Sequence, residues 1–218
     1  MRILITGANG LVGQGVLREC LQAPDVTQVV ALGRHPSGQV HAKLGELACA
    51  DFADLRQLED RLQPFDACLY CAGAQVMGTP EDDYRRVTLD LTMNVARTLA
   101  RLNPALTFVY ISGAHSDPAS WLMPLRVKGE TERALAALPI RTVMFRPGGI
   151  QPVHGVRSPH AVLDALYGVA APILGFGVRV LPNVMTTTER IGRAMLQVLR
   201  QDDPPPFVEN AEINRLGA

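Results

Sequence analysis

A short apolar run near the start of the chain ends in three evenly spaced glycines, and this feature constrains the fold more than any other. Residues 2–6 are rich in β-forming side chains, and glycines follow at positions 7, 10 and 13. An apolar helical pattern then covers residues 11–21, and a proline ends it. A strand, a glycine turn and a helix in this order are typical of a dinucleotide-binding βα unit. A glycine-rich loop in some other α/β fold is the alternative.

Each glycine of this turn suits a role that a Cβ atom would obstruct. We expect Gly7 to permit the tight turn off the strand and Gly10 to let the backbone approach a pyrophosphate. Gly13 is expected to let the helix pack closely on the strand. The helix would direct free N–H groups and the positive end of its dipole at the phosphates. The turn therefore predicts a dinucleotide as the ligand.

Apolar runs and helical patterns alternate over the first 150 residues. We expect strands at residues 2–6, 28–32, 47–50, 67–71, 106–111 and 141–145. The helical patterns between them cover residues 11–21, 55–62, 81–102 and 125–138. This alternation predicts an α/β fold, a doubly wound parallel sheet (Rossmann fold) with the strand order 3-2-1-4-5-6. The residues expected at its ligand crevice, at the carboxyl ends of the strands, are Gly7, Arg34, Asp51, Cys71, Ser112 and Pro147.

The chain is long enough for one α/β domain with a well-buried core, and we expect a single domain over residues 1–218. The alternation breaks down after residue 150, where residues 151–187 are rich in Pro, Gly and His. We expect this stretch, with one helical candidate at 161–171, to form a small cap on the substrate side. Thr187 is expected to begin a helix over 190–200, and three consecutive prolines stiffen the tail after it.

Basic and acidic side chains balance, with 21 Lys plus Arg against 21 Asp plus Glu. No global field then attracts the chain to nucleic acid or to an anionic membrane, and neither is expected as a partner. The chain enters its first strand within two residues, which leaves no room for a signal peptide, and no long apolar run predicts a membrane span. We expect a cytoplasmic protein.

Cys68 and Cys71 have the C-x-x-C spacing of redox-active pairs. They fall in an expected strand, where residues three apart point to opposite faces, whereas a redox pair would sit at a helix N-terminus. We therefore expect buried, reduced, structural thiols. The five histidines show no metal-ligand spacing, so no metal site is expected.

The end of the second strand distinguishes between the two nicotinamide cofactors. An NAD-specific site usually places an acid here, where it accepts hydrogen bonds from the adenine ribose. No acid occurs between Asp25 and Glu46, whereas Arg34 offers a fork of donors that suits a 2′-phosphate. The sequence therefore predicts NADP(H) in preference to NAD(H), with a solvated arginine as the alternative. Asp51 and Phe52 are expected near the adenine, unless Asp51 only starts a helix.

Several short motifs, in this order, resemble the atypical short-chain dehydrogenase/reductase superfamily of NAD(P)-binding Rossmann proteins. They are Thr6-Gly7-Ala8-Asn9-Gly10-Leu11-Val12-Gly13, Tyr70-Cys71-Ala72-Gly73, Ile111-Ser112-Gly113-Ala114, Val127-Lys128-Gly129 and Phe145-Arg146-Pro147-Gly148. Residues 126–148 resemble its Tat-interacting-protein-like branch and the bacterial relatives of that branch. The resemblance covers about residues 1–200 and implies cofactor contacts at Gly7, Asn9, Gly10, Leu11, Val12, Gly13, Cys71, Ala72, Gly73, Lys128 and Pro147.

In active members of this superfamily a serine orients the substrate oxygen, a tyrosine transfers the proton, and a lysine four residues later binds the nicotinamide ribose. Ser112 and Lys128 match the serine and the lysine, although Ser112 also fits as a small residue at a crowded strand end. The tyrosine position is Pro124, which has no ionisable group, so the usual proton relay is missing. His115 is a candidate proton donor, with a solvated loop histidine as the alternative.

Two functions remain open on these residues. The first is an NADPH-dependent oxidoreductase or epimerase that acts on a small carbonyl compound. The second is a cofactor-binding protein without turnover, in which bound NADP orders residues 147–187 and presents a surface to a protein partner. Because the tyrosine is absent, we expect a dinucleotide-binding protein whose catalytic competence is in doubt.

Overall fold

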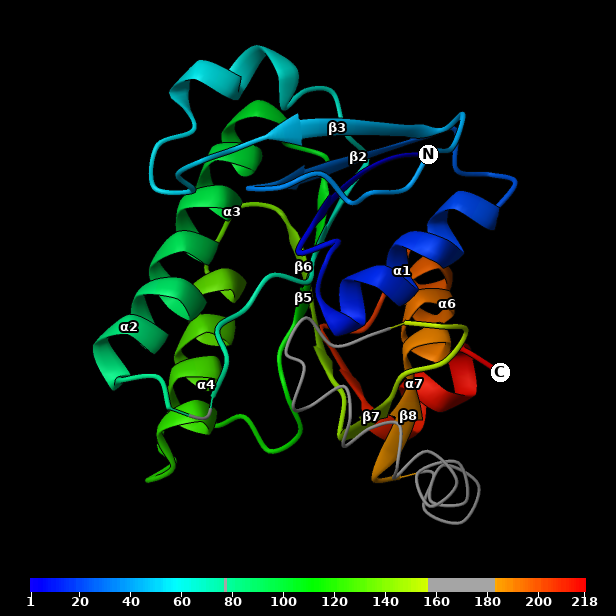
Figure 1. Ribbon diagram of the computed structural model, residues 1–218. Helices are drawn as coiled ribbons and strands as arrows, with labels where there is room; N and C mark the ends of the chain where they lie inside the picture. The colour runs from blue at the N-terminus through cyan, green and yellow to red at the C-terminus, as the bar shows by residue number, and fades with distance from the viewer. Residues whose placement is uncertain (77, 157–182) are drawn as a thin grey trace.

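A seven-stranded parallel sheet lies at the centre of the computed structural model, which describes residues 1–76, 78–156 and 183–218 (Figure 1). The strand order is β3-β2-β1-β4-β5-β6-β9, and each neighbouring pair is parallel. The strands are β1 (Arg2–Thr6), β2 (Gln28–Gly33), β3 (Leu44–Ala48), β4 (Ala67–Tyr70), β5 (Thr107–Ile111), β6 (Arg141–Arg146) and β9 (Phe207–Glu209). The order predicted for six strands is confirmed, and β9 adds a seventh beside β6.

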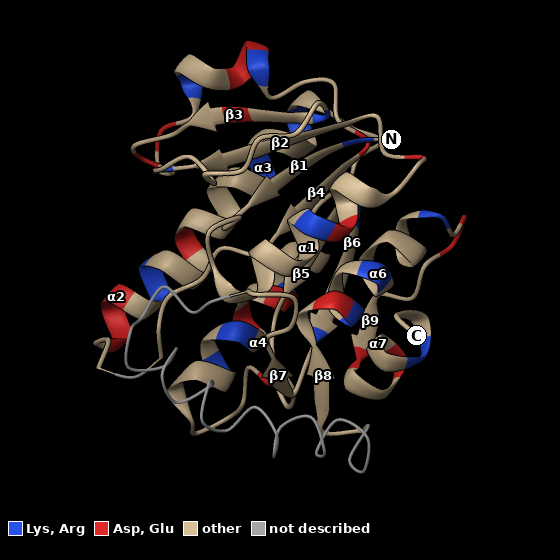
Figure 2. Ribbon diagram, turned by 45° about the vertical axis from the view of Figure 1, so that its right-hand side comes forward, with Lys and Arg blue, Asp and Glu red and all other residues tan. Residues whose placement is uncertain are grey.

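Helices cover both faces of the sheet, which confirms the doubly wound Rossmann fold (Figure 1). One face carries α1 (Leu11–Gln22), α6 (Thr188–Leu199) and α7 (Asn210–Leu216). The other face carries α2 (Glu81–Arg85), α3 (Leu91–Leu102) and α4 (Met123–Ala136). Basic and acidic segments are interspersed along the described ribbon, in line with the balanced charge (Figure 2).

The side chains of β1 alternate between two apolar cores, one on each face of the sheet. Ile3 and Ile5 pack in the core that contains residues of α1 and α6. Leu4 packs in the opposite core, with residues of α3. All three side chains are fully buried, and burial of an aliphatic side chain contributes roughly 1.5–3 kcal/mol. The central strand is therefore fixed from both sides, and its carboxyl end has a defined position.

Two elements after β2 differ from the sequence prediction. The third strand was expected over residues 47–50, but β3 begins at Leu44. It lies at the sheet edge, where Gly45 and the exposed Glu46 interrupt the apolar pattern and conceal its first half. The helix expected over residues 55–62 is a 3₁₀ helix, η1 (Arg56–Arg61).

The long helix expected over residues 81–102 contains a π-helical turn, η2 (Arg86–Asp90), between α2 and α3. Its Thr88 carbonyl accepts hydrogen bonds from Thr92 Oγ1 at 2.7 Å and from Thr131 Oγ1 at 3.4 Å. Because Thr131 belongs to α4, the π turn is tied to that helix. Turns of this kind are frequent at functional sites.

The region after residue 148 forms a second, two-stranded parallel sheet from β7 (Gly149–Gln151) and β8 (Met185–Thr187). The helical candidate at 161–171 lies outside the described residues. Thr187 caps α6 as predicted, since its Oγ1 accepts a hydrogen bond from the Arg190 N–H at 3.1 Å. Neither β9 nor α7 was predicted, because β9 has only three residues and follows the prolines.

We expect Gly13→Ala to lower the free energy of unfolding by about 3 kcal/mol, near the upper end of typical overpacking costs. A Cβ at this position would lie 2.0 Å from the Gly7 carbonyl oxygen, and a backbone atom cannot give way cheaply. Gly45→Ala is the matched control, because its Cβ would meet only ordinary contacts from 3.7 Å outwards. Urea denaturation of both variants measures the difference, and equal stability would contradict the tight packing.

Candidate functional site

A cavity of about 410 Å³ opens at the carboxyl ends of β1, β2 and β4. Predicted residues that line it are Gly7, Asn9, Gly10, Arg34, Phe52, Cys71, Ala72 and Gly73. Sequence reasoning missed its other lining residues, Ala8, Ala31, Leu32, Gly33 and His35. These residues could have been predicted from the sequence, because they lie in the glycine turn and at the end of the second strand. The predicted residues outside this lining are Leu11, Val12, Gly13, Asp51, Ser112, His115, Lys128 and Pro147.

Two of the three glycines are required by the protein's own backbone. Gly7 has a φ of +68°, and a Cβ there would lie 2.5 Å from the Ala72 nitrogen, in the loop after β4. Gly13 packs against the Gly7 carbonyl. Gly10 differs, because its backbone is extended and a Cβ would come near only the Gly7 oxygen, at 3.2 Å. Its missing side chain therefore leaves room in the cavity rather than in the fold.

The first turn of α1 begins at Gly10, and no side chain in the described part of the chain caps it. The N–H groups of Leu11, Val12 and Gly13 lie in this turn, where an α-helix has no internal acceptor for them. Such groups, together with the helix dipole, form an anion-binding position. A hydrogen bond within the unit stabilises this turn, since Gln14 Nε2 donates to the Asn9 carbonyl at 3.0 Å.

Asn9 ties the glycine turn to the loop after β2. Its Nδ2 donates to the carbonyls of His35 at 3.3 Å and Pro36 at 3.1 Å. Arg34 is exposed at the cavity, and no acidic side chain within the described ranges forms an ion pair with it. Glu46, on the neighbouring strand, accepts hydrogen bonds from Ser37 instead. The guanidinium of Arg34 is thus available to an anionic ligand.

Phe52 and Asp51 follow β3 but differ in their surroundings. Phe52 lines the cavity, and its carbonyl accepts a hydrogen bond from Asn94 Nδ2 at 2.7 Å. Asp51 does not line it, and its Oδ1 accepts from the Ala53 N–H at 2.8 Å. This carboxylate thus forms a local turn contact, whereas the helix that follows, η1, begins at Arg56, so Asp51 does not start it.

Lys128 and Ser112 meet at the carboxyl end of β5. Lys128 Nζ donates a hydrogen bond to the Ser112 carbonyl oxygen at 2.6 Å. The Ser112 hydroxyl is buried and donates to Ser116 Oγ at 3.0 Å, which in turn donates to the Gly113 carbonyl at 2.8 Å. Ser116 was missed, because the sequence carries no information on where these hydroxyls point. The Ser112 hydroxyl thus donates within its own loop.

Burial lowers the pKa of Lys128 to about 8, and the nearby Glu132 carboxylate opposes this shift. Pro124 lies in the first turn of α4, where proline fits because it has no N–H to leave unpaired. It stands one helical turn before Lys128, on the same face of the helix. Residue 124, the expected tyrosine position, is therefore a rigid apolar ring one helical turn before Lys128.

His115 and Pro147 lie in the loops after β5 and β6. His115 is exposed and has a left-handed φ of 62°. Pro147 is buried, and its carbonyl accepts a hydrogen bond from the Ala114 N–H at 2.9 Å. This bond joins the two loops and fixes the Ser112 end of β5 relative to β6.

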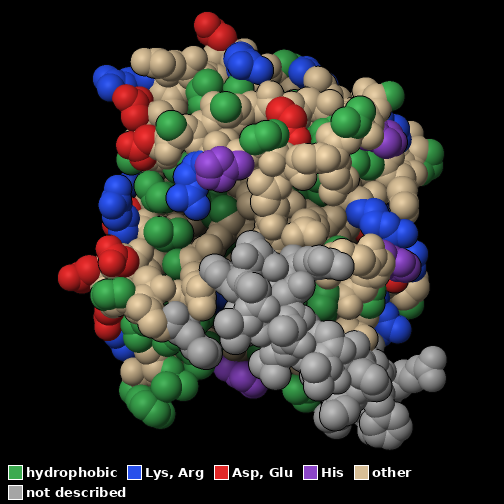
Figure 3. Space-filling view, in the orientation of Figure 1, with side chains coloured by type: hydrophobic (Ala, Val, Ile, Leu, Met, Phe, Trp, Pro, Cys, Tyr) green, Lys and Arg blue, Asp and Glu red, His purple; other side chains and the backbone are tan. Residues whose placement is uncertain are grey.

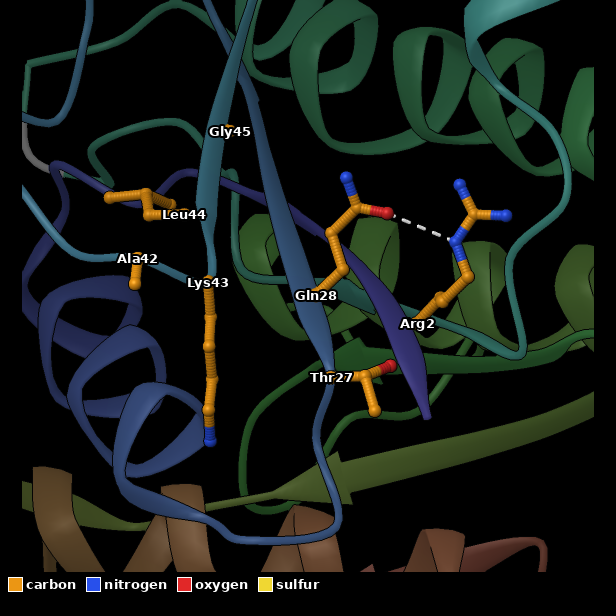
Figure 4. A pocket seen from close by; sticks show the side chains of 7 residues that line it. All are labelled: Arg2, Thr27, Gln28, Ala42, Lys43, Leu44 and Gly45. Atoms are coloured by element: carbon orange, nitrogen blue, oxygen red, sulfur yellow. Dashed lines mark hydrogen bonds between the residues drawn. The ribbon is translucent and has the colours of Figure 1, made fainter.

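Another hollow, of about 380 Å³, lies near the amino ends of β1, β2 and β3 (Figure 4). Arg2 Nε donates to Gln28 Oε1 at 3.0 Å there. Lys43 points away from that pair, and its Nζ donates to the Ala23 carbonyl at the end of α1. Because ligands of such sheets bind at the carboxyl ends of the strands, this hollow is not the cofactor crevice.

The four cysteines are free, and burial raises the pKa of the Cys20 thiol to about 12. Burial also raises the pKa values of Cys68 and Cys71 above their ordinary range.

Within the described residues, no cluster of His, Cys, Asp and Glu could hold a metal ion. No helix in the same part of the chain is long and apolar enough to cross a membrane. Basic, acidic and neutral side chains are mixed on the visible face (Figure 3).

The sequence profile described as the NAD dependent epimerase/dehydratase family matches residues 3–120, more than half of the chain. "Leucinostatins biosynthesis cluster protein T" of Purpureocillium lilacinum is 27% identical over 136 residues, which are 60% of this chain and 50% of that protein. The chain thus spans about half the length of this relative. "Protein FMP52, mitochondrial" of Saccharomyces cerevisiae is 29% identical over 163 residues, which are 72% of this chain and 68% of that protein.

Solved structures with the same architecture include the UDP-glucuronic acid 4-epimerase from Bacillus cereus in complex with NAD. It superposes with a TM-score of 0.71 at 15% identity, and the superposition covers 95% of this chain and 77% of the epimerase chain. The Bordetella bronchiseptica enzyme WbmH in complex with NAD+ superposes with a TM-score of 0.67 at 16% identity, over 91% and 71% of the two chains. The family match and this shared fold confirm the resemblance to the short-chain dehydrogenase/reductase superfamily.

We expect the buried thiols of Cys20, Cys49 and Cys68 to resist a thiol-specific disulfide reagent near pH 8 in the folded protein, because a protonated buried thiol is a poor nucleophile. After denaturation all four should react. Counting modified cysteines by mass spectrometry before and after unfolding checks this. Rapid modification of Cys68 and Cys71 in the folded protein would favour the redox reading of their spacing.

Proposed function

The chain belongs to the NAD dependent epimerase/dehydratase family, and from this membership we propose that it binds NADP(H), in preference to NAD(H), in the crevice lined by its glycine turn. The observation that carries the proposal is the pairing of an open Gly10 with an unpartnered Arg34 across one cavity. A dinucleotide needs a close backbone approach at its pyrophosphate, and the 2′-phosphate needs a cation at the end of β2.

Further residues suit the other parts of this cofactor, from its adenine end to its nicotinamide end. We assign the pyrophosphate to the N–H groups of Leu11, Val12 and Gly13, and the adenine side to Phe52. Cys71, Ala72 and Gly73 form the opposite cavity wall, and Lys128 and the Pro147 loop belong to the nicotinamide end. When bound, the nicotinamide supplies or accepts a hydride. The protein's own contribution is to hold and orient the cofactor and to exclude water from it.

The family's usual acid is missing, so cofactor binding is the primary function that we propose. Pro124 cannot move a proton, and the Ser112 hydroxyl already donates to Ser116. The second candidate is an NADPH-dependent oxidoreductase or epimerase that acts on a small carbonyl compound. The observation that favours it is the place of Lys128, which is half-buried at the carboxyl end of β5 and donates a hydrogen bond to the Ser112 carbonyl there.

The finer predictions on organisation and location stay predictions. We retain a single domain over residues 1–218, with 151–187 as a cap on the substrate side. A cytoplasmic location also stays a prediction, and the yeast relative carries the word mitochondrial in its name.

We predict that NADP(H) binds about ten- to a hundredfold more tightly than NAD(H), since charge-assisted hydrogen bonds contribute roughly 1.5–3 kcal/mol. Calorimetric titration of the protein with both cofactors measures the ratio. Arg34→Ala should abolish the preference, whereas Arg56→Ala, an exposed arginine of η1 outside the cavity lining, should keep it. Equal affinities in the wild type would refute the assignment of Arg34.

We predict that Gly10→Val folds normally but loses dinucleotide binding by a hundredfold or more, a shift of about 2.7 kcal/mol. The extended backbone of residue 10 accepts a side chain, which would then fill the space left for the pyrophosphate. Circular dichroism monitors folding, and calorimetry with NADPH monitors binding. Gly45→Val, at the distant edge strand, is the control. Tight NADPH binding by folded Gly10→Val would show that the turn serves the fold alone.

A further inference from the structure

The chain has only two lysines, Lys43 and Lys128, among its 21 basic residues, and the other 19 are arginines. An arginine holds its charge at any physiological pH and cannot release a proton. A lysine can release a proton near neutral pH when burial disfavours its charged form. The two lysines lie at opposite ends of the sheet, Lys43 near the amino ends of the strands and Lys128 at the carboxyl end of β5.

Lys128 is held by backbone and lies beside a glycine. Its Nζ donates to the Ser112 carbonyl oxygen at 2.6 Å, at the end of β5. A Cβ on Gly113 would stand 3.3 Å from this nitrogen, so glycine at this position spares the ammonium group one close neighbour. One hydrogen bond uses one of the three ammonium protons and leaves others for a ligand.

The charged groups around Lys128 leave its ammonium largely uncompensated. Glu132, on the same helix, is the carboxylate that acts on it, but both oxygens of Glu132 are bound by the Arg146 guanidinium of β6 at 2.9 and 2.6 Å. The other charged neighbours along α4 are paired with α2, Glu130 with Arg85 and Arg126 with Glu81. Burial therefore dominates, and it brings the pKa of Lys128 down to about 8.

The other hydroxyl and phenol groups of this region either donate hydrogen bonds within the protein or are buried in its core. The Ser112 hydroxyl donates to Ser116, and Pro124 has nothing to donate. Tyr84 and Tyr110 are fully enclosed in the core, and burial raises their pKa values. His115 is an exposed loop residue. Among the described groups at the carboxyl end of β5, Lys128 is the one whose lowered pKa suits proton exchange near neutral pH, although it lies outside the lining of the glycine-turn cavity.

We propose that Lys128 is the general acid–base residue of this site, in the place of the missing tyrosine, and that it serves a small carbonyl substrate. This rests on the proposed binding of NADP(H). Lys128 gives one ammonium proton to the carbonyl oxygen while the carbonyl carbon gains a hydride from NADPH. A C–H and an O–H bond form, and the electron pair of the C=O π bond moves to oxygen. The carbonyl is reduced to an alcohol, NADPH is oxidised to NADP+, and the neutral lysine regains its proton from water.

The first test needs no cofactor. In protein labelled with ¹³C- and ¹⁵N-lysine, only two side-chain signals are present, and Lys43→Arg assigns them. We expect the Lys128 signal to titrate near pH 8. A midpoint at pH 10 or above would overturn the proposal, because such an ammonium group gives up its proton too reluctantly near neutral pH.

The second test separates proton transfer from cofactor binding. Lys128→Arg keeps the charge and donors that hold a ribose but cannot release a proton. We expect it to bind NADPH within about threefold of the wild type. Its turnover of a panel of small aldehydes, ketones and quinones should fall by 10²-fold or more, the usual contribution of a positioned acid. The limb near pH 8 in the wild-type rate profile should also vanish. Lys43→Arg should change neither rate nor profile.

Each contrary outcome is informative. A wild type that binds NADPH but turns over no carbonyl of the panel, or a Lys128→Arg protein with an unchanged rate and pH profile, would overturn the role of Lys128 alone. A wild type that binds no NADPH would overturn the proposed function as well.

Discussion

The close contact between the glycine turn and its surroundings is the constraint on which the site depends. Gly7 fits only because no Cβ separates it from the loop after β4, and Gly13 fits only because nothing separates α1 from the Gly7 carbonyl. These two contacts bring the start of α1 directly over the end of β1. Gly10 is then left facing the cavity with its N–H-rich turn exposed. The backbone packing that closes the fold thus also opens the anion-binding position.

The crevice combines two halves that the protein holds by different means. The adenine half is held by Asn9, whose side chain joins the glycine turn to the backbone beside Arg34. The region around Lys128 is held by α4, which the π turn η2 contacts through Thr131, one turn after Lys128. Under the proposed function, the protein keeps cofactor recognition in the first half while the proton chemistry of the second half differs from that of the superfamily, because Pro124 stands at the expected tyrosine position.

The sequence predicted the fold and much of the cavity lining, because both follow from regular patterns. Apolar strands, helical periods and the glycine spacing specify the order of six strands and most of the cavity residues. The three-residue strand β9 could not be predicted, since its position depends on pairing with β6 rather than on its own composition. The engagement of Ser112 by Ser116 was also invisible, because motif spacing does not say where a hydroxyl points. The π turn was not predicted either, and its Thr88 carbonyl accepts a hydrogen bond from Thr131, which is distant in the sequence.

The most direct measurement of the central claim is a crystal structure of the protein grown with NADP+. We expect the pyrophosphate against Gly10 and the first turn of α1, the 2′-phosphate within hydrogen-bond distance of Arg34, and the nicotinamide ribose beside Lys128. A dinucleotide bound in another hollow, or in this crevice with its 2′-phosphate turned away from Arg34, would contradict the account.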